Sequence, residues 1–381
     1  MINGNLLILF RDKVNSNAYF ALHNYKNNNG KNEWNLICSC MDWLTVAVRY
    51  LMQSTINSKD MDAKSMQVYS FISAIDIVYQ SILQLHKTIY NTKTTPFKGN
   101  KDIFGYSILL RDESIKGTDK DKVDDNSSFK HIRAMFGAHP VDLKDNNKKW
   151  FASWPYNDST SDNDIDLSLY SENPDEDSIT IGIKINDLIK FLETRYNYLN
   201  VLIEELDRQF EEFCNKLRNK EINHCENALD QLYILRDESK IRLDTDGYRE
   251  NIDELIILFT AHNTIESNIQ IVNEYRSQLT KVVREIEANL QDMRFANLET
   301  QYILRPDYNY SDIGYSVSKL FGYVHAGTNE HFYPVAVKEV KKYYSNYVII
   351  HDNMTPNEIL LLAKAAQFYL AKDTKTTPTP L

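Results

Sequence analysis

The residues best suited to chemistry lie in one short segment, from Phe129 to Pro140, with the sequence FKHIRAMFGAHP. Within it, Arg133 and His139 are separated by five residues. An arginine keeps its positive charge at physiological pH, whereas an imidazole gains and loses a proton near neutrality. A guanidinium can hold two phosphate oxygens while an imidazole moves a proton, so this pair suits the cleavage of a phosphodiester.

RNA can be cut without a metal when its 2′-hydroxyl loses a proton and the charge that develops on the phosphorus group is held. In this hypothesis His139 transfers the proton and Arg133 binds the scissile phosphate. Lys130 and His131 come directly before Arg133 and are candidate substrate-binding residues. The structural alternative is an ordinary helix in which Arg133 forms a salt bridge and His139 caps a turn.

The segment predicts a short amphipathic helix with Ser127 or Ser128 as its N-cap. Pro140 ends this helix because the residue before a proline is driven out of the α-helical region. Six positions along a continuous α-helix leave the two side chains roughly 120° apart. One helix therefore presents the pair poorly, and a second copy across a dimer would bring an arginine and a histidine together.

The pattern Arg133-x5-His139 in a helix-rich setting resembles the Arg-x(4–6)-His motif of the HEPN superfamily of ribonucleases. The stretch around it is similar to motifs of the abortive-infection members that act against phage. The resemblance covers about residues 34–140 and part of a later long helix. It implies a helical bundle that dimerises, with a composite site that cleaves RNA without metal or other cofactor. It also implies prokaryotic antiphage defence or toxin activity, with an antitoxin or sensor as a further partner.

The chain departs from the family pattern at Ala134, because HEPN members usually have a polar residue directly after the arginine. Ala134, the acidity of the whole chain and a long heptad helix motivate a second hypothesis. This is a non-catalytic helical interaction or scaffold protein, either an inactive HEPN relative or a partner-binding subunit. The sequence leaves the choice between an endoribonuclease and a scaffold open.

The composition predicts a mainly helical protein, because the 381 residues include only 11 glycines and 9 prolines. The formal net charge of −10 argues against a protein that coats nucleic acid generally. The charge is uneven, however. Residues 1–150 contain 20 lysines and arginines against 15 acidic residues, and the remainder contains 23 against 38. The mildly basic part contains the Arg133/His139 pair and is the part suited to a phosphate backbone.

The cysteine spacing matches no zinc site and is too sparse for a disulfide framework, so we expect free thiols in a reducing cytosol. The four cysteines are Cys38, Cys40, Cys214 and Cys225. The apolar run from Leu6 to Phe10 is too short for a signal-peptide core or a membrane span. These features predict a cytoplasmic protein with no membrane partner, no metal and no cofactor.

Apolar periodicity predicts helices at about 34–52 and 62–90, and alternating residues predict a small antiparallel β-meander between 148 and 185. A 4-3-4-3 spacing from Leu192 to Leu217 predicts one long helix of about 35 residues. Its stripe is either an internal bundle seam or a dimer seam. The expected fold class is mainly α, a HEPN-type helical bundle with the small β insertion and additional C-terminal helices.

The expected organisation has an N-terminal helical region with the Arg/His motif, the β insertion, a long-helix bundle, a C-terminal helical region and a disordered tail. Their boundaries are residues 1–147, 148–185, 186–300, 301–373 and 374–381.

Overall fold

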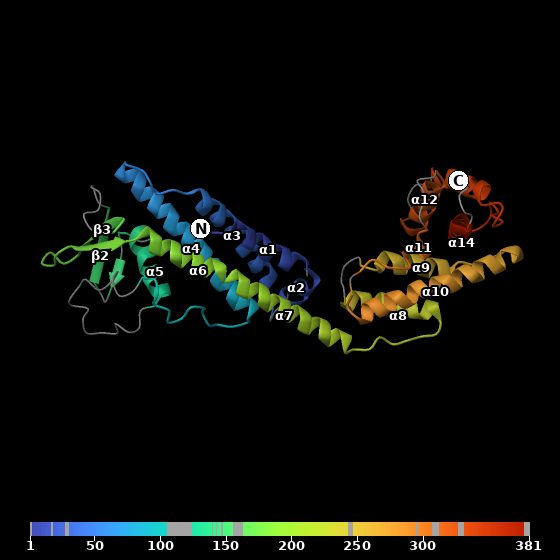
Figure 1. Cartoon of the computed structure of the whole chain (residues 1–381), viewed down its shortest axis with the longest axis horizontal. Coiled ribbons are helices and arrows are strands. Elements are labelled where there is room, and N and C mark those ends of the chain that lie inside the picture. The colour runs from blue at the N-terminus through green and yellow to red at the C-terminus, as the bar shows by residue number, and fades with distance from the viewer. Residues whose placement is uncertain are drawn as a thin grey trace. The chain divides into compact units, whose positions relative to one another are not determined.

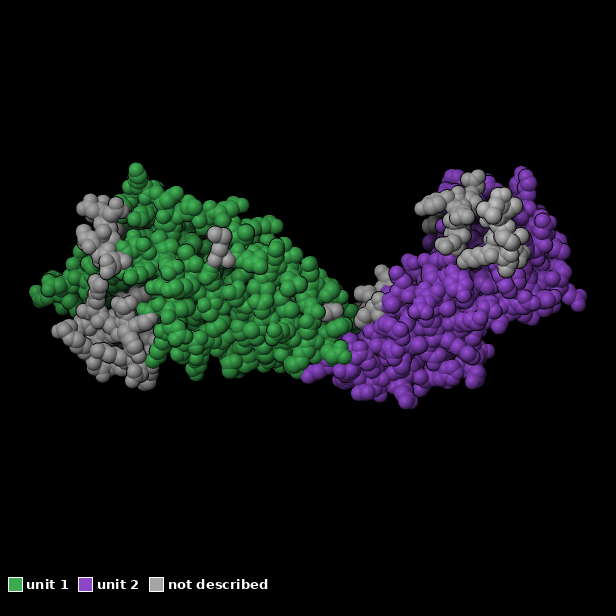
Figure 2. Space-filling view, viewed as in Figure 1, with its two compact units in different colours: residues 1–211 green, residues 212–381 purple. Residues whose placement is uncertain are grey.

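The computed structural model divides into two compact units, residues 1–211 and residues 212–381, which Figure 2 colours green and purple. The division falls inside the region 186–300 expected as one part, and the finer boundaries expected from the sequence stay predictions. Helices dominate both units, and the small antiparallel sheet belongs to the first, which confirms the expected mainly α fold with a β insertion. The residues that the structure describes are 2–16, 18–26, 30–104, 124–138, 140–141, 143–145, 148–154, 163–242, 247–294, 296–306, 312–326 and 331–376.

The first unit is built on a hairpin of two long helices, α3 (Glu33–Gln53) and α4 (Met61–Ile89). The side chain of Asn32 caps α3 by accepting a hydrogen bond from an amide of its first turn at 3.1 Å. Asp60 caps α4 in the same way at 2.8 Å. The two helices pack side by side, and both lie close to the ranges that apolar periodicity predicts.

The N-terminal segment forms two helices, α1 (Gly4–Ser16) and α2 (Ala18–Tyr25). α1 packs on α3, and Figure 1 shows both in dark blue. The hydroxyl of Tyr196 ties the start of the chain to the core, because it donates to the carbonyl of Asn3 and accepts from the amide of Leu7.

α4 is the one helix in the described part of the chain that is long and apolar enough to cross a membrane. Within its most apolar window, 61% of the residues are buried inside the protein. Val68, Ile72, Ile75 and Val78 are all fully buried there. Packing in the core of the first unit therefore accounts for the apolar character of this helix.

The sheet is a four-stranded antiparallel meander in the order β1-β2-β3-β4. Three strands lie in the expected range 148–185, and β1 precedes it. The strands are β1 (Leu143–Asp145), β2 (Lys148–Ser153), β3 (Ile165–Ser171) and β4 (Ile179–Ile183). In β3 the buried residues Ile165, Leu167 and Leu169 alternate with less buried ones, so one face of the sheet packs on the core.

Gly182 of β4 occupies a position that only glycine fits. Its cross-strand partner is Asp166, and the amide of Asn163 donates a hydrogen bond to the Asp166 carboxylate at 3.0 Å. A Cβ at position 182 would collide with both of these side chains. The missing side chain therefore lets a polar pair lie flat across the strand.

The long helix predicted from the heptad spacing is two helices in line, α6 (Ile185–Asn197) and α7 (Leu199–Arg218). Tyr198 separates them but keeps a right-handed helical backbone, with φ −61° and ψ −16°. α6 and α7 therefore follow nearly one line in Figure 1. The prediction of one uninterrupted helix is wrong at this residue.

The first half of the heptad stripe is an internal seam. Leu192, Tyr196, Leu199 and Leu206 are buried in the core of the first unit. This burial answers the question that the sequence left open for residues 192–206, because these side chains pack within their own chain.

Helices are the only regular secondary structure in the described residues of the second unit. Three of its elements, α8, α9 and α10, pack on one another, and α14 packs on α9 and α10. The elements are α8 (Ala228–Arg242), α9 (Arg249–Thr260), η3 (Glu266–Asn268), α10 (Ile269–Gln291), α11 (Gln301–Leu304), α12 (Asp312–Ala326), α13 (Tyr333–Tyr343) and α14 (Pro356–Thr376). The additional C-terminal helices expected from the sequence are therefore present. Residues 377–381 of the expected tail lie outside the described residues.

A buried ion pair joins two helices of the second unit. Lys364 of α14 lies 2.7 Å from Glu254 of α9, and both side chains are almost completely buried. The Lys364 ammonium also donates to the carbonyl of Leu304 at 3.1 Å. Separating the two helices would leave each charge without its partner, so the contact fixes α9 against α14.

Candidate functional site around Arg133

The helix that carries the motif, α5 (Asp125–Arg133), begins one turn before the expected N-cap residues. Asp124 is the cap, because its Oδ1 accepts a hydrogen bond from the amide of Ser127 at 2.9 Å. Its Oδ2 accepts a second one from Gly99 at 3.1 Å. Burial raises the pKa of Asp124, but these amide bonds and nearby Arg195 outweigh burial, so the pKa lies below its ordinary value. The expectation of Ser127 or Ser128 as N-cap is therefore wrong.

An aromatic cluster holds the inner face of α5. The ring of Phe129 stacks on Phe191 of α6, with centroids 4.3 Å apart, and meets Tyr79 of α4 edge-on at 5.9 Å. Phe129 and Ile132 are fully buried. Two helices, α4 and α6, therefore fix the orientation of α5, and the positions of the residues on its other face are set by the same contacts.

Arg195 of α6 fixes the start of α5. Its Nη2 donates to Oδ1 of Asn126 at 2.9 Å, and its guanidinium lies over the rings of Phe191 and Phe97, 3.9 and 4.7 Å from their centroids. The side chain is fully buried, and burial lowers its pKa to about 10, although Asp125 partly opposes this change. Phe97 has a positive φ of 64°, a costly conformation for a bulky residue. The stacked cation helps to hold it there.

Arg133, the last residue of α5, forms an ion pair with Asp76 of α4. Its Nε lies 2.7 Å from Oδ2 of Asp76, with 44% of the arginine side chain exposed against 12% of the aspartate. The side-chain amide of Gln80, one turn further along α4, donates to the other carboxylate oxygen at 3.3 Å. The guanidinium is thus held on the surface of α4 while almost half of its side chain stays accessible to solvent.

Lys130 and His131 lie on the exposed face of α5, the face that also carries Arg133. Three residues that can carry positive charge therefore share the last turn of this helix, and all three are exposed, whereas Phe129 and Ile132 are buried. Such a face can contact an anionic backbone. A solvated helix surface has the same composition, so the face by itself does not decide the ligand.

After Arg133 the chain forms a π-helical turn, η2 (Ala134–Ala138). The prediction of a continuous α-helix up to Pro140 is wrong here, and the angle of roughly 120° derived for such a helix does not apply. Two side chains of the turn, Met135 and Phe136, are buried. Phe136 meets the ring of Trp154 edge-on at 5.6 Å. Single π turns of this kind occur frequently at functional sites.

Gly137 lies within the π turn against Tyr69 of α4. A Cβ at this position would meet the tyrosine ring at 3.5 Å, an ordinary contact distance. Tyr69 and Asp76 are seven residues apart on α4, which is two helical turns, so they share one side of this helix. α4 therefore supports both the arginine and the turn that follows it.

His139 lies outside the described residues, so its distance from Arg133 and its role stay predictions. The chain is anchored again directly after it, because the carbonyl of Pro140 accepts a hydrogen bond from the amide of Ala152 in β2 at 2.6 Å. Of the four predicted site residues, the structure places Arg133, Lys130 and His131 on the exposed face of α5 and gives Arg133 an acidic partner.

Reasoning from sequence did not select Asp76, yet the sequence contains a signal for it. Between Asp62 and the end of α4 at Ile89, Asp76 is the one acidic residue, and it stands inside an apolar run. A carboxylate that is buried with such neighbours needs a partner. Its partner, however, lies 57 positions away in the chain, and no local pattern identifies it.

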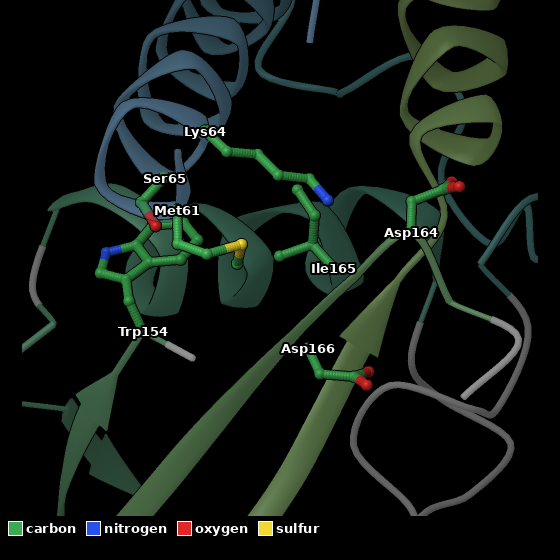
Figure 3. A pocket seen from close by; sticks show the side chains of 7 residues that line it. All are labelled: Met61, Lys64, Ser65, Trp154, Asp164, Ile165 and Asp166. Atoms are coloured by element: carbon green, nitrogen blue, oxygen red, sulfur yellow. The ribbon is translucent and has the colours of Figure 1, made fainter. Parts of the chain in front are cut away.

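A small cleft lies between the start of α4 and the sheet, and Figure 3 shows its lining. Its empty volume is about 230 Å³, below the usual size of a small-molecule site. Asp164 caps α6 there by accepting from the amide of Ile185 at 2.7 Å, and Asp166 is held by Asn163. The lining residues are Met61, Lys64, Ser65, Trp154, Asp164, Ile165 and Asp166. Two of its acidic groups thus have structural roles.

The described residues contain no group of three or more histidines, cysteines or acidic residues arranged to hold a metal ion. No protein-family model, curated protein or solved structure matches this chain. The argument for function therefore depends on the arrangement around Arg133.

Proposed function

We propose that this protein is a metal-independent endoribonuclease of HEPN type, active in the cytoplasm in prokaryotic antiphage defence or as a toxin. The observation that carries the proposal is the state of Arg133. It is a surface arginine fixed by Asp76, with 44% of its side chain exposed and with Lys130 and His131 on the same helix turn. Because Asp76 already restricts the Arg133 side chain, binding a phosphate costs it less conformational entropy than it would cost an unrestrained arginine.

The proposed reaction uses the pair in separate roles. His139 removes the proton of an RNA 2′-hydroxyl, whose oxygen then attacks the adjacent phosphorus. Arg133 holds the phosphate oxygens as negative charge develops on them. The leaving 5′-oxygen takes up a proton, so the products are a 2′,3′-cyclic phosphate and a 5′-hydroxyl. Lys130 and His131 bind the RNA backbone on either side of the scissile phosphate and orient it.

A homodimer belongs to the proposal, because an arginine and a histidine from two copies would complete each site. RNA is the substrate. An antitoxin or sensor protein would keep the nuclease silent until infection. Asp76 acts through Arg133, because it sets the direction of the guanidinium.

The deciding experiment is an RNA cleavage assay in the presence of a metal chelator. Wild-type protein should cut RNA, and both Arg133→Ala and His139→Ala should reduce the rate by about a hundredfold or more. Arg249→Ala is the matched control, because Arg249 is an exposed arginine of the second unit, and it should cut like wild type. Equal cutting by all four proteins would remove the assignment.

The second candidate is a non-catalytic helical interaction protein. The observation that favours it is an exposed apolar strip on α3, where Trp43 and Val46 have more than half of their surface in solvent. In that case no RNA cleavage appears under any condition. Arg133→Ala then changes only stability or complex formation.

A further inference from the structure

One helix of the first unit is apolar on both of its faces. The inner face of α3 is buried and includes Ile37, Met41, Leu44, Val48 and Leu51. The outer face also carries large apolar side chains, separated by seven, three and four residues. These are Leu36 (36% exposed), Trp43 (55%), Val46 (59%) and Tyr50 (40%). We call these four residues the α3 strip.

The spacing of the α3 strip is that of a helix that packs against another helix along its length. Single exposed apolar residues are normal, but a row of four at heptad spacing marks an interaction surface. The neighbours α1 and α4 pack on other sides of α3, and no described residue covers the strip. The seam formed by Leu192 to Leu206 is already buried inside the unit. It therefore cannot serve two copies.

The charges beside the strip indicate what covers it. Asp42 and Arg49 stand seven residues apart, so both lie along the same edge of the strip. Arg49 is exposed and has no ion pair with a described residue. Asp42 has a highly exposed side chain whose one ion pair within the described residues is with Arg11, at 3.2 Å. Opposite charges on one edge complement a second copy of the same helix that runs in the reverse direction.

Two copies that pair antiparallel about a two-fold axis would bury the α3 strip and pair the charges beside it at the same time. In an antiparallel pair of helices, residues that directly precede the core positions of one helix lie beside the equivalent residues of the other. When Trp43 of one copy packs against Val46 of the other, Asp42 of each copy therefore lies beside Arg49 of the other. The contact is isologous, because each residue of the first copy meets the same set in the second. Two apolar layers and two ion pairs form at once.

The position of this axis relates the strip to the Arg133 segment. Val46 is seven residues before the end of α3 and Tyr69 is eight residues after the start of α4, so they lie about 10 and 12 Å from the connecting loop. In an antiparallel hairpin these two residues are at one level. Tyr69 lies against Gly137 of the π turn. The π turn of each copy thus lies at the level of the two-fold axis.

We propose that the α3 strip is the interface through which two copies of this chain associate. This inference rests on the proposed function in one respect, because that function needs a site shared between two copies. The α3 strip is the contact that would bring the two copies together. The apolar residues provide the binding energy, and the Asp42–Arg49 pairs set the antiparallel direction.

The test is the mass of the full-length protein in solution, measured by light scattering at micromolar concentration without RNA. Wild type should be a dimer, and Val46→Asp should be a monomer with an unchanged circular dichroism spectrum. Val335→Asp is the matched control, because Val335 is an equally exposed valine of the second unit, at 53% against 59%, and it should stay dimeric. A monomeric wild type, or a dimeric Val46→Asp variant, overturns the proposal.

A charge exchange tests the direction of pairing. Arg49→Glu should weaken the dimer by about tenfold or more, since it places two acidic residues together. Asp42→Lys combined with Arg49→Glu should restore most of the affinity. A double variant as weak as the single one contradicts the antiparallel register.

These results are separable from the nuclease assay. A dimer that depends on Val46 but does not cut RNA retains the interface and removes the proposed function. RNA cutting by a monomeric Val46→Asp variant retains a nuclease and removes the shared site.

Discussion

Asp76 and Arg133, 57 positions apart in the sequence, lie 2.7 Å from each other and join the central helix α4 to the end of α5. The aspartate is mostly buried, whereas almost half of the arginine side chain is in solvent. This difference gives the two residues different roles. Asp76 belongs to the interior of the unit, and Arg133 belongs to its solvent-exposed surface.

Replacing Asp76 by Asn should separate positioning from folding. The amide keeps the shape of the carboxylate but not its charge, so the variant should lose about 1 kcal/mol of unfolding free energy in a urea titration. RNA cleavage should fall by about tenfold, because the guanidinium is no longer fixed. Asp62→Asn alters an exposed aspartate of the same helix and should change neither quantity. If Asp76→Asn cuts RNA at the wild-type rate, Asp76 has no positioning role.

Phe129 should be among the most sensitive positions of the first unit. Phe129→Ala removes a fully buried ring that stacks on Phe191, and we expect a loss of about 3–5 kcal/mol in unfolding free energy. Phe332→Ala is the control, since Phe332 is 57% exposed and should change stability by less than about 0.5 kcal/mol. Similar losses at both positions would contradict the packing described for α5.

Two glycine substitutions should act in opposite directions. Gly182→Ala pushes aside the Asn163–Asp166 pair that lies across β4, and we expect it to lower the unfolding free energy by about 1–2 kcal/mol. Gly322→Ala lies in α12 with open space around it and should raise the unfolding free energy by about 0.5–1 kcal/mol. Thermal unfolding of both variants measures the signs. Stabilisation by Gly182→Ala would mean that Asn163 and Asp166 lie elsewhere.

His86 should make stability depend on pH. Burial, and secondarily Lys87, lower the pKa of His86 below its ordinary value of 6.5 in the folded protein. As the pH falls below about 6.5 the unfolded chain takes up a proton that the folded chain does not, so stability falls. Urea titrations at about pH 7.5 and pH 5.5 should show this decrease, and His86→Gln should reduce it. An equal decrease in His86→Gln would assign the pH dependence to another group.

Much of the helical fold follows from the order of apolar residues. The periodicity at 62–90 predicts α4, and the alternation around Ile165 predicts β3, because both elements bury one regular stripe of side chains. The break at Tyr198 has no such signal, since neither proline nor glycine is present and the backbone stays helical. The N-cap at Asp124 was missed because Ser127 and Ser128 are equally good caps and stand closer to the apolar residues.

The candidate site was predictable to a smaller extent. The residue types around Arg133 identify the segment, because they are the types that phosphodiester chemistry needs. Its acidic partner was not predictable, since Asp76 meets Arg133 only after α4 and α5 have packed. The π turn was not predictable either, because the apolar sequence AMFGA from Ala134 to Ala138 does not distinguish a π turn from an α turn.

That turn has a consequence for how the motif tolerates changes in length. A π turn holds one residue more than the α turn that it replaces. Deleting Ala134 would therefore let the helix close into regular α geometry while Phe136 kept its place against Trp154. The spacing between Arg133 and His139 would shorten from five residues to four, which still lies within the Arg-x(4–6)-His pattern. One extra residue, accommodated in a single π turn, is thus enough to lengthen the motif while the packing of the surrounding unit stays the same.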